Sequence, residues 1–197
     1  LRMVPNLDVW RPCDSVEAFV AWQVALEHKE TPTALILTRQ NLAHQTRDEE
    51  QIKAIRKGGY VLKDCAGTPK AVIIATGSEV SLAVAAQQSL AEKGIPVRVV
   101  SMPSSFLFDR QDAAYRDSVL PRGIPRVAVE AGSTTGWYRY VGLEGAVVGI
   151  DGAVVRVATE RGAVTARTLD AVAIGDRVQI KNGIATKAPV AKQVFPV

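Results

Sequence analysis

The apolar residues near the start of the chain follow first a helical period and then a strand pattern. Between Val16 and Val24 they recur at the three- and four-residue spacing of a helix. Asp14, followed three residues later by Glu17, resembles a capping box, so we expect a helix over residues 15–28. Residues 33–38 then form an apolar run without polar alternation, which is typical of a strand buried on both faces.

The same alternation of helix and strand continues along the chain. Further helices are expected over residues 48–57, over 79–93 with Ser78 as N-cap and Gly94 as the stop, and from Asp109 as cap to about Val119. Further strands are expected over residues 60–62, 71–76, 97–101, 126–130 and 146–150.

Strands that alternate with helices predict the α/β class, with a mainly parallel sheet and flanking helices. Such sheets bind ligands beyond the carboxyl ends of their strands. Residues 76–79 and 130–135 are therefore the places where a site is expected. Gly77-Ser78 could be an anion site at a helix N-terminus, but no glycine-rich phosphate fingerprint surrounds it, which favours a capped turn.

Residues 151–197 differ from the rest and predict a short β-rich tail. Strands are expected over residues 153–158 and 163–168, which flank a hairpin-like turn at Glu160-Arg161-Gly162. Residues 177–181 alternate before Asn182-Gly183, a strong hairpin signal. The tail is either a small β-barrel or a set of strands added to the sheet edge. Apolar sheet surface that it leaves uncovered would favour association of the chain.

Composition excludes several classes of protein. With 47% hydrophobic and 22% charged residues in 197, the chain is globular rather than disordered or fibrous. The net charge is +4, and residues 151–197 supply most of it, with seven basic against four acidic residues. Phe195 is the one aromatic residue in that region, whereas a nucleic-acid-binding surface would combine a basic stripe with several aromatic residues. No run approaches the roughly 18 apolar residues of a membrane span, and no leader opens the chain. We expect a cytoplasmic protein and, because Leu1 begins in an extended-looking stretch, a piece of something longer.

The titratable residues form no recognisable catalytic or metal-ligand motif. Cys13 and Cys65 are expected to be free thiols, and neither stands at metal-ligand spacing from a histidine. Six residues could suggest acid–base chemistry, but none is paired at catalytic spacing, and we interpret them as caps and surface groups: Asp14, Glu17, His28, His44, Asp109 and Glu130.

A series of motifs resembles the C-terminal portion of transketolases, in the family's order and over residues 1–150. They are residues 1–14, Leu37-Thr38-Arg39-Gln40-Asn41, Gly58-Gly59-Tyr60-Val61-Leu62, Ala75-Thr76-Gly77-Ser78-Glu79-Val80, Ser101-Met102-Pro103-Ser104, Phe108-Asp109-Arg110-Gln111-Asp112, residues 115–121 and Val127-Ala128-Val129-Glu130-Ala131-Gly132. After Ile150 the chain departs from the family, which would continue into a Gly-Glu-Ser-Ala-Pro-like turn and a final helix.

The resemblance implies three regions: the end of the pyrimidine-binding domain (1–63), the C-terminal α/β domain (64–150) and a tail of unknown origin (151–197). It implies an enzyme of the pentose phosphate pathway that moves a two-carbon ketol unit from a ketose phosphate to an aldose phosphate. Thiamine diphosphate and Mg²⁺ or Ca²⁺ are the family's cofactors, and its intact members are homodimers. The cofactor and metal ligands and the catalytic glutamate belong to parts of the family that precede this chain. We therefore expect no catalytic, cofactor-binding or metal-binding residue here, and an inactive chain when it is alone.

Arg39 is the one site residue that the resemblance carries across, as the arginine that grips the substrate's terminal phosphate. A planar, permanently charged guanidinium just past the end of a strand suits that task. Two alternatives to an enzyme fragment stay open: a non-catalytic association or regulatory module, and a structural chimera without activity. Trp10, Trp22 and Trp137 could anchor an interface, although core packing is the interpretation that we favour for each.

Overall fold

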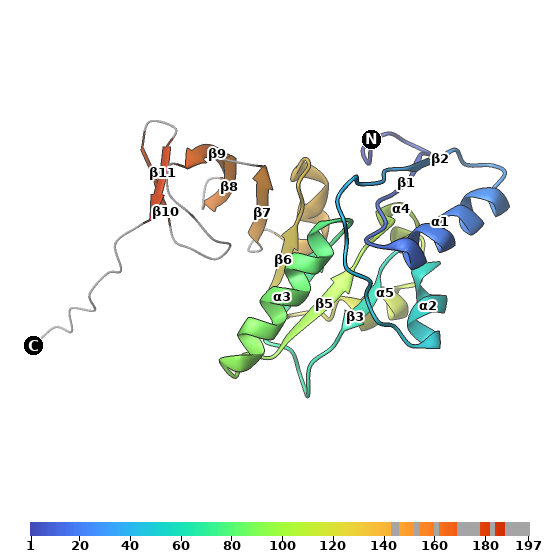
Figure 1. Cartoon of the computed structure of the whole chain (residues 1–197), viewed down its shortest axis with the longest axis horizontal. Helices are drawn as coiled ribbons and strands as arrows, with labels where there is room; N and C mark the ends of the chain where they lie inside the picture. The colour runs from blue at the N-terminus through green and yellow to red at the C-terminus, as the bar shows by residue number, and fades with distance from the viewer. Residues whose placement is uncertain (143–145, 152–153, 160–161, 169–177, 182–183, 188–197) are drawn as a thin grey trace, which may run out of the picture.

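The computed structural model describes residues 1–142, 146–151, 154–159, 162–168, 178–181 and 184–187, and from Ala146 onward it describes the backbone alone. Figure 1 shows one α/β body in which helices lie on both sides of a sheet, with further strands beyond it toward the C-terminus. The strands that carry this architecture are β1 (Asp8–Trp10), β2 (Thr33–Leu35), β3 (Tyr60–Lys63), β4 (Ala71–Ala75), β5 (Val97–Ser101), β6 (Arg126–Val129) and β7 (Ala146–Asp151).

The helices are α1 (Ser15–Glu27), α2 (Glu49–Ile55), α3 (Glu79–Glu92), α4 (Ser105–Asp109), α5 (Ala113–Val119) and α6 (Tyr138–Val141), with a 3-10 turn over Thr135–Trp137. Three helices, α1, α2 and α3, lie within a few residues of the predicted ranges, whereas the short helices α4 and α6 were not predicted. Gly94 ends α3 with a positive φ of 70°, as expected of a helix stop.

The large sheet has the strand order β10-β11-β9-β8-β7-β6-β4-β5-β3, and its part from β7 to β3 is mainly parallel, as predicted. β4 pairs in parallel with both β5 and β6, and β6 pairs in parallel with β7. The strand β3 joins the edge in the antiparallel direction. β1 and β2 form a separate, two-stranded parallel sheet, in which Val9 lies opposite Ala34.

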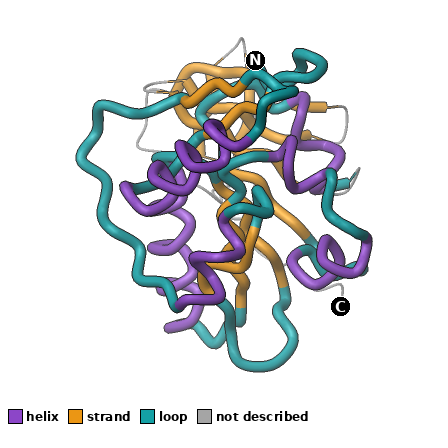
Figure 2. Tube along the Cα trace, turned by 90° about the vertical axis from the view of Figure 1, so that its right-hand side faces the viewer, coloured by secondary structure: helices purple, strands orange, loops and turns teal. Residues whose placement is uncertain are grey.

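Two clusters of buried side chains fill the two sides of the large sheet. Ile73 and Ala75 of β4 join the cluster that contains α1 and α3, whereas Val72 and Ile74 join the cluster under α4, α5 and α6. This division follows the two-residue period of a strand, which sends successive side chains to opposite faces. Figure 2 shows the helices along the sheet. Because the first cluster includes Trp10, the segment before residue 45 shares its core with the sheet that follows.

Three local predictions were wrong, wholly or in part. β2 ends at Leu35 and is half-buried, because among the described strands it pairs with β1 alone, and Ile36 and Leu37 are exposed. Ser78 occupies the N-cap position of α3, as predicted, but its side chain makes no capping hydrogen bond, since its hydroxyl donates to Glu79 Oε1 at 2.8 Å.

The third error concerns the helix after β5. Asp109 starts no helix but ends α4, and Asp112 caps α5 by accepting a hydrogen bond from the Tyr115 N–H at 2.7 Å. The residues just before Asp109 form a short helix, α4, which Ser104 caps.

The described strands of the tail continue the large sheet. Of the two alternatives, a small β-barrel or strands added to the sheet edge, the structure therefore shows the added strands. β8 (Val154–Thr159) pairs antiparallel with β7, and β9 (Gly162–Thr168) pairs antiparallel with β8, with Thr159 opposite Gly162. β10 (Val178–Lys181) and β11 (Ile184–Lys187) form the second predicted hairpin. The turn residues 160–161 and 182–183 lie outside the described residues.

Within the described part of the chain, the helices are all too short or too polar to cross a membrane.

Candidate functional site

The two loops that the sequence singled out meet beyond the carboxyl ends of β4 and β6. A cavity of about 480 Å³ opens beside the loop after β6. Its wall combines apolar side chains with polar and charged groups, namely Leu1, Arg2, Met3, Val9, Arg11, Ile36, Ser105, Glu130, Ala131, Gly132, Ser133, Thr135, Gly136, Trp137, Arg139 and Tyr140. The parallel strands of the sheet therefore position a concave site where this fold class is expected to have one.

Glu130 is the centre of the polar side of this cavity, and its side chain is 1% exposed. Its two carboxylate oxygens receive the guanidinium groups of Arg2 and Arg11. The Gly132 N–H donates to the same carboxylate at 3.0 Å, and the Trp137 indole N–H lies 3.3 Å from it. Burial by itself would raise the pKa of Glu130, but Arg2 and Arg11 outweigh it and hold the pKa below its ordinary value.

Arg11 ties the first strand to both loops. Besides Glu130, its guanidinium reaches Glu79 Oε2 at 3.1 Å and packs against Gly77, where an added Cβ would stand 3.3 Å from it. Arg2 meanwhile donates to the Thr76 hydroxyl at 3.1 Å. The positive charge on this side of the cavity is therefore matched by carboxylates within the chain, and the interpretation of Gly77-Ser78 as an anion site gains no support.

Arg39 lies in the loop after β2, four residues past the last residue of the strand, and is exposed. Within the described residues it takes part in no hydrogen bond or ion pair, so its guanidinium is available to a ligand. Its neighbours Thr38 and Gln40 line a second hollow, of about 250 Å³, together with the turn at Gly77 and Ser78.

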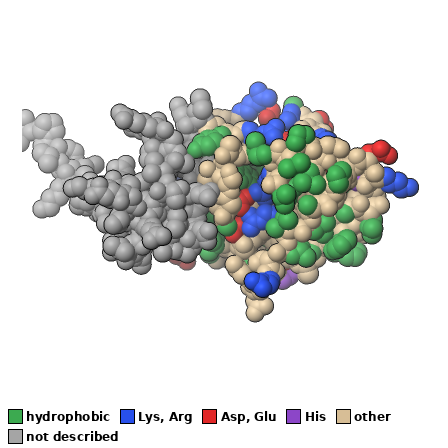
Figure 3. All heavy atoms as spheres, turned by 90° about the horizontal axis from the view of Figure 1, so that it is seen from above, with side chains coloured by type: hydrophobic (Ala, Val, Ile, Leu, Met, Phe, Trp, Pro, Cys, Tyr) green, Lys and Arg blue, Asp and Glu red, His purple; other side chains and the backbone are tan. Residues whose placement is uncertain are grey.

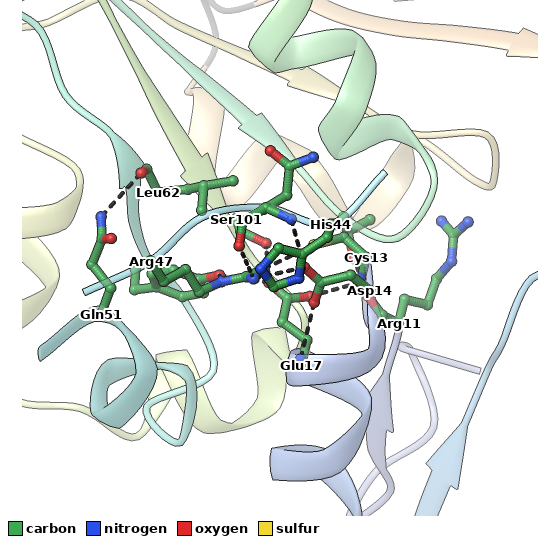
Figure 4. Close-up of polar contacts among 12 residues, drawn as sticks. Arg11, Cys13, Asp14, Glu17, His44, Arg47, Gln51, Leu62 and Ser101 are labelled. Atoms are coloured by element: carbon green, nitrogen blue, oxygen red, sulfur yellow. Dashed lines mark hydrogen bonds and ion pairs between the residues drawn. The ribbon is translucent and has the colours of Figure 1, made fainter. Parts of the chain in front are cut away.

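A second polar cluster, which the sequence did not reveal, is buried between α1 and the sheet (Figure 4). Glu17 is fully buried. Its Oε1 accepts hydrogen bonds from the Tyr60 hydroxyl at 2.8 Å and the Ser101 hydroxyl at 2.6 Å, and its Oε2 accepts one from the Cys13 N–H at 2.7 Å. Arg47 completes the cluster by donating to the Tyr60 hydroxyl at 2.6 Å.

Asp14 caps α1 as predicted, accepting from the Glu17 N–H at 3.1 Å, and also accepts from Arg47 at 2.6 Å. Burial would raise the pKa of Asp14, but hydrogen bonds from Arg47 and from backbone N–H groups keep it below its ordinary value. Burial and the nearby Glu17 carboxylate raise the pKa of the Cys13 thiol, which therefore stays protonated and unreactive. Cys13 and Cys65 are both free, as expected.

The interpretation of the acidic residues as caps and surface groups was thus wrong for Glu17 and Glu130. Their partners, such as Ser101 for Glu17 and Arg2 for Glu130, stand 84 and 128 residues away along the chain, so no local spacing could point to them. Asp109 also has partners, since its carboxylate accepts from the Tyr140 hydroxyl at 2.8 Å. His44 is 64% exposed, and His28 is exposed at the end of α1.

Of the tryptophans, Trp10 and Trp137 are core residues, whereas Trp22 is 55% exposed. Within the described residues, no three His, Cys, Asp or Glu side chains lie together in a way that could hold a metal ion.

Comparisons with known families agree with the resemblance in the sequence. The family model of the transketolase-like C-terminal domain matches residues 58–153, and that of the transketolase pyrimidine-binding domain matches residues 1–45.

Individual relatives give the same result. Transketolase 1 of Escherichia coli strain K12 is 62% identical over 151 residues, which are 76% of this chain and 23% of that protein. The structure of transketolase from Leishmania mexicana superposes with a TM-score of 0.70 at 44% identity, covering 81% of this chain and 22% of that one. A structure described as a split gene transketolase, an inactive beta4 tetramer, has a TM-score of 0.58 at 25% identity and covers 76% of this chain and 50% of that one.

The chain spans about a quarter of the length of the curated relatives that it matches. The three comparisons agree on the same part of the chain: the family models, the sequence identity to transketolases and the similarity of the fold. Over residues 1–153 this chain therefore belongs to the transketolase family.

Proposed function

We propose that this chain is the sugar-phosphate-binding, C-terminal part of a transketolase, and that it contributes to ketol transfer only together with the remainder of such an enzyme. The observation that carries the proposal is the position of Arg39: exposed, unpaired within the described residues, and beside a hollow past the end of β2. In the reaction a two-carbon ketol unit passes from a ketose phosphate to an aldose phosphate.

The described residues do not fit the family's cofactor, thiamine diphosphate with Mg²⁺ or Ca²⁺. No described cluster of acidic, histidine or cysteine side chains could hold the metal. The two arginines beside the cavity of about 480 Å³ are engaged by Glu130 and Glu79 and leave little charge for a diphosphate. We therefore propose that another polypeptide region supplies the cofactor site, and we assign no catalytic residue to this chain.

The task that we propose for Arg39 is to hold the terminal phosphate of the sugar. A guanidinium offers two parallel N–H groups to phosphate oxygens, which fixes the direction of the substrate as well as its affinity. Since Arg39 is exposed and stands without the rest of the enzyme, its binding of phosphate in this chain alone should be weak and sensitive to salt.

Calorimetric titration with fructose 6-phosphate at low salt tests the assignment. We expect weak binding that Arg39→Ala abolishes and Arg39→Lys reduces, since lysine keeps the charge but loses the planar fork. Arg122→Ala is the matched control, because Arg122 is an exposed arginine that precedes the amino end of β6, at the opposite end of the sheet. Equal binding by Arg39→Ala and the unaltered chain would show that Arg39 is not the phosphate ligand.

Titration with thiamine diphosphate and Mg²⁺ tests the second half of the proposal. We expect no heat of binding from this chain. Clear binding would overturn the proposal that the cofactor site lies elsewhere and would make the chain an enzyme in its own right.

Mixing this chain with the N-terminal part of a transketolase distinguishes an enzyme part from the two alternatives. Recovery of ketol transfer that depends on Arg39 supports the proposal. Binding without activity favours a non-catalytic association or regulatory module, and no effect favours a structural chimera. The related chain of the split gene transketolase is described as an inactive tetramer, which is consistent with a C-terminal part that associates without being active alone.

We further propose that the domain boundaries follow the resemblance, at about residues 63 and 150, and that the whole protein is a cytoplasmic homodimer. The two family models leave residues 46–57 between them, a few residues before the proposed first boundary, since one stops at residue 45 and the other begins at residue 58. Limited proteolysis checks it: cleavage between residues 45 and 58 should precede cleavage within β4 or α3.

A further inference from the structure

The loop that carries Arg39 runs from β2 to α2, over residues 36–48, and has no helix or strand of its own. Within the described residues, no hydrogen bond joins residues 37–43 to a residue outside the loop. A local bond shapes the chain at Arg39, since the Thr38 hydroxyl accepts the Gln40 N–H at 3.1 Å. The position of Arg39 relative to the rest of the molecule therefore depends on how the two ends of the loop are held.

One short stretch of chain, just before α1, holds both ends of this loop. At the entry, the Ile36 N–H donates to the Trp10 carbonyl at 2.8 Å. At the exit, Asp14 Oδ2 accepts a hydrogen bond from the Gln45 N–H at 2.9 Å and one from Arg47 Nη1 at 2.6 Å. Since Trp10 and Asp14 are only four residues apart, the two ends of the loop lie close together, as they do in compact surface loops.

The exit of the loop is held by a buried ion pair. The side chain of Arg47 is 1% exposed and that of Asp14 is 3% exposed (Figure 4). Arg47 also donates to the Gln45 carbonyl at 2.7 Å and to the Tyr60 hydroxyl at 2.6 Å, so its guanidinium joins the loop to the start of α1 and to β3. A buried ion pair adds little net stability, but it can select the one arrangement in which its charges are matched.

We propose that Asp14 and Arg47 are positioning residues for Arg39: by holding the exit of the loop, they fix where the Arg39 guanidinium meets a sugar phosphate. This inference rests on the function proposed for Arg39. It adds that the affinity for the phosphate depends on a buried pair that the ligand does not touch.

The surface makes the position of a single guanidinium important. In Figure 3 apolar side chains gather broadly on the part of the surface away from the grey residues, and Lys and Arg side chains stand among them without forming a continuous basic face. The attraction between exposed charges is weak and is screened by salt, so it depends on close approach. A two-pronged contact between guanidinium and phosphate also requires the correct direction. A loop that moves freely would supply neither.

Asp14→Asn separates the anchor of the loop from the cap of the helix. Asparagine caps helices as well as aspartate does, so its carbonyl oxygen can still accept the Glu17 N–H. Its amide group is a donor and would face two other donors, the Gln45 N–H and Arg47, so the exit of the loop is released. Asp112→Asn is the matched control, because Asp112 caps α5, which packs on the opposite side of the large sheet from α1.

Arg47→Lys tests the same anchor from its other partner. Lysine keeps the positive charge but loses the planar fork that reaches Asp14, the Gln45 carbonyl and Tyr60 together. Arg126→Lys is the control, since Arg126 is also partly buried and donates to three backbone carbonyls, none of them in the loop. Circular dichroism and urea unfolding confirm that each variant is folded, and if one of the two anchor variants fails to fold, the other decides.

Nitrogen-15 relaxation measures the order of the loop without a ligand. The backbone order parameters of residues 38–43 should be about 0.8 in the unaltered chain and fall below about 0.6 in Asp14→Asn and Arg47→Lys. They should stay unchanged in the two controls, whatever stability those variants lose.

Titration of the same samples with fructose 6-phosphate at low salt measures the consequence for binding. The dissociation constant should rise about 10-fold in both anchor variants, because a loosened loop presents Arg39 in the correct place only part of the time. The two controls should bind the sugar phosphate as the unaltered chain does.

The outcomes distinguish this inference from the proposed function on which it rests. A loop that is equally ordered, or equally mobile, in the unaltered chain and in the anchor variants overturns the inference, and so does an unchanged affinity in a loosened loop. The proposed function itself fails if the unaltered chain binds no fructose 6-phosphate, or if Arg39→Ala binds it equally well, and the positioning role then falls with it.

Discussion

At the scale of single residues, the most informative groups are two buried carboxylates that hold distant parts of the chain together. Glu130 receives Arg2 and Arg11 from the first segment, and Glu17 receives hydroxyl groups from Tyr60 and Ser101. An ionised carboxylate is tolerated in the interior only when charges and hydrogen bonds replace the water that it loses. Each therefore depends on all of its partners, and removal of one partner should be costly.

Replacing Glu130 with glutamine tests this dependence. The change leaves two guanidinium groups without their carboxylate and should lower the free energy of unfolding by about 3 kcal/mol at pH 7. Because the pKa of Glu130 is lowered by folding, its contribution is complete above the ordinary value of 4.5 and is lost as the pH falls further, through the folded-state pKa.

The difference in urea stability between the unaltered chain and Glu130→Gln should therefore shrink as the pH falls below about 4.5. Glu92→Gln, at an exposed position near the end of α3, should show no such difference at any pH. A gap that does not change with pH would mean that the carboxylate charge is not what stabilises the protein.

Tyr60→Phe removes the hydroxyl that lies between Glu17 and Arg47. Since Glu17 stays buried and loses a donor, the free energy of unfolding should fall by about 2 kcal/mol. Tyr138→Phe, at a residue that is 40% exposed, should change it by less than about 0.5 kcal/mol. Chemical denaturation of both variants gives the comparison, and equal values for the two would contradict the role assigned to the cluster.

At the scale of elements, the turn between α2 and β3 decides how closely α4 can approach β3. Gly58 has a φ of 82°, and a Cβ placed there would stand 2.2 Å from the Ser104 carbonyl oxygen and 2.6 Å from the Phe108 nitrogen. Both neighbours are backbone atoms, which cannot move aside as a flexible side chain could. The start of α4 therefore approaches this turn as closely as it does only because residue 58 is glycine.

Gly58→Ala should accordingly lower the free energy of unfolding by more than about 4 kcal/mol or prevent folding. Gly94→Ala is its control, since Gly94 has a similar φ of 70° but no atom within 4 Å of the added Cβ. That variant should lose about 1–2 kcal/mol, the cost of the left-handed conformation alone. Thermal unfolding followed by circular dichroism separates the two, and similar losses would show that the contact with α4 matters little.

At the scale of the whole molecule, the two family regions share one interior. The cluster that holds Trp10, Val20 and Val24 also holds Tyr60, Leu62 and Ile73, so neither region has a separate core on that side.

Unfolding in urea should therefore be a single transition over the described body. Trp10 and Trp137 report from the first segment and from the end of the C-terminal region, and both are buried. The tryptophan fluorescence, to which the exposed Trp22 also contributes, and the far-ultraviolet circular dichroism should give the same midpoint at a concentration where the chain is a single species. Midpoints that differ between the two signals would show that the regions unfold independently.

Much of the fold was predictable from the sequence because helices and strands depend on contacts between residues a few positions apart. The period of apolar residues located α1, α3, β4 and β5, and their alternation implied a parallel sheet. The rule for the carboxyl ends of parallel strands then located the cavity beside Glu130. Errors arose at residues of the type that caps helices, such as Ser78 and Asp109. The side chain of such a residue can form a hydrogen bond with another side chain instead of capping a helix, as both do here.

The sequence by itself thus determined the order of the elements, the class of the sheet, the end of the sheet that carries the cavity, and the family. Only the tertiary structure decided that Glu17 and Glu130 are buried, that β2 pairs with β1 in a separate sheet, and that the strands after β7 extend the large sheet. The physical reason is distance along the chain. A helical or strand period is set by backbone geometry within a few residues, whereas the partners of a buried carboxylate or a strand edge come from anywhere that folding brings together.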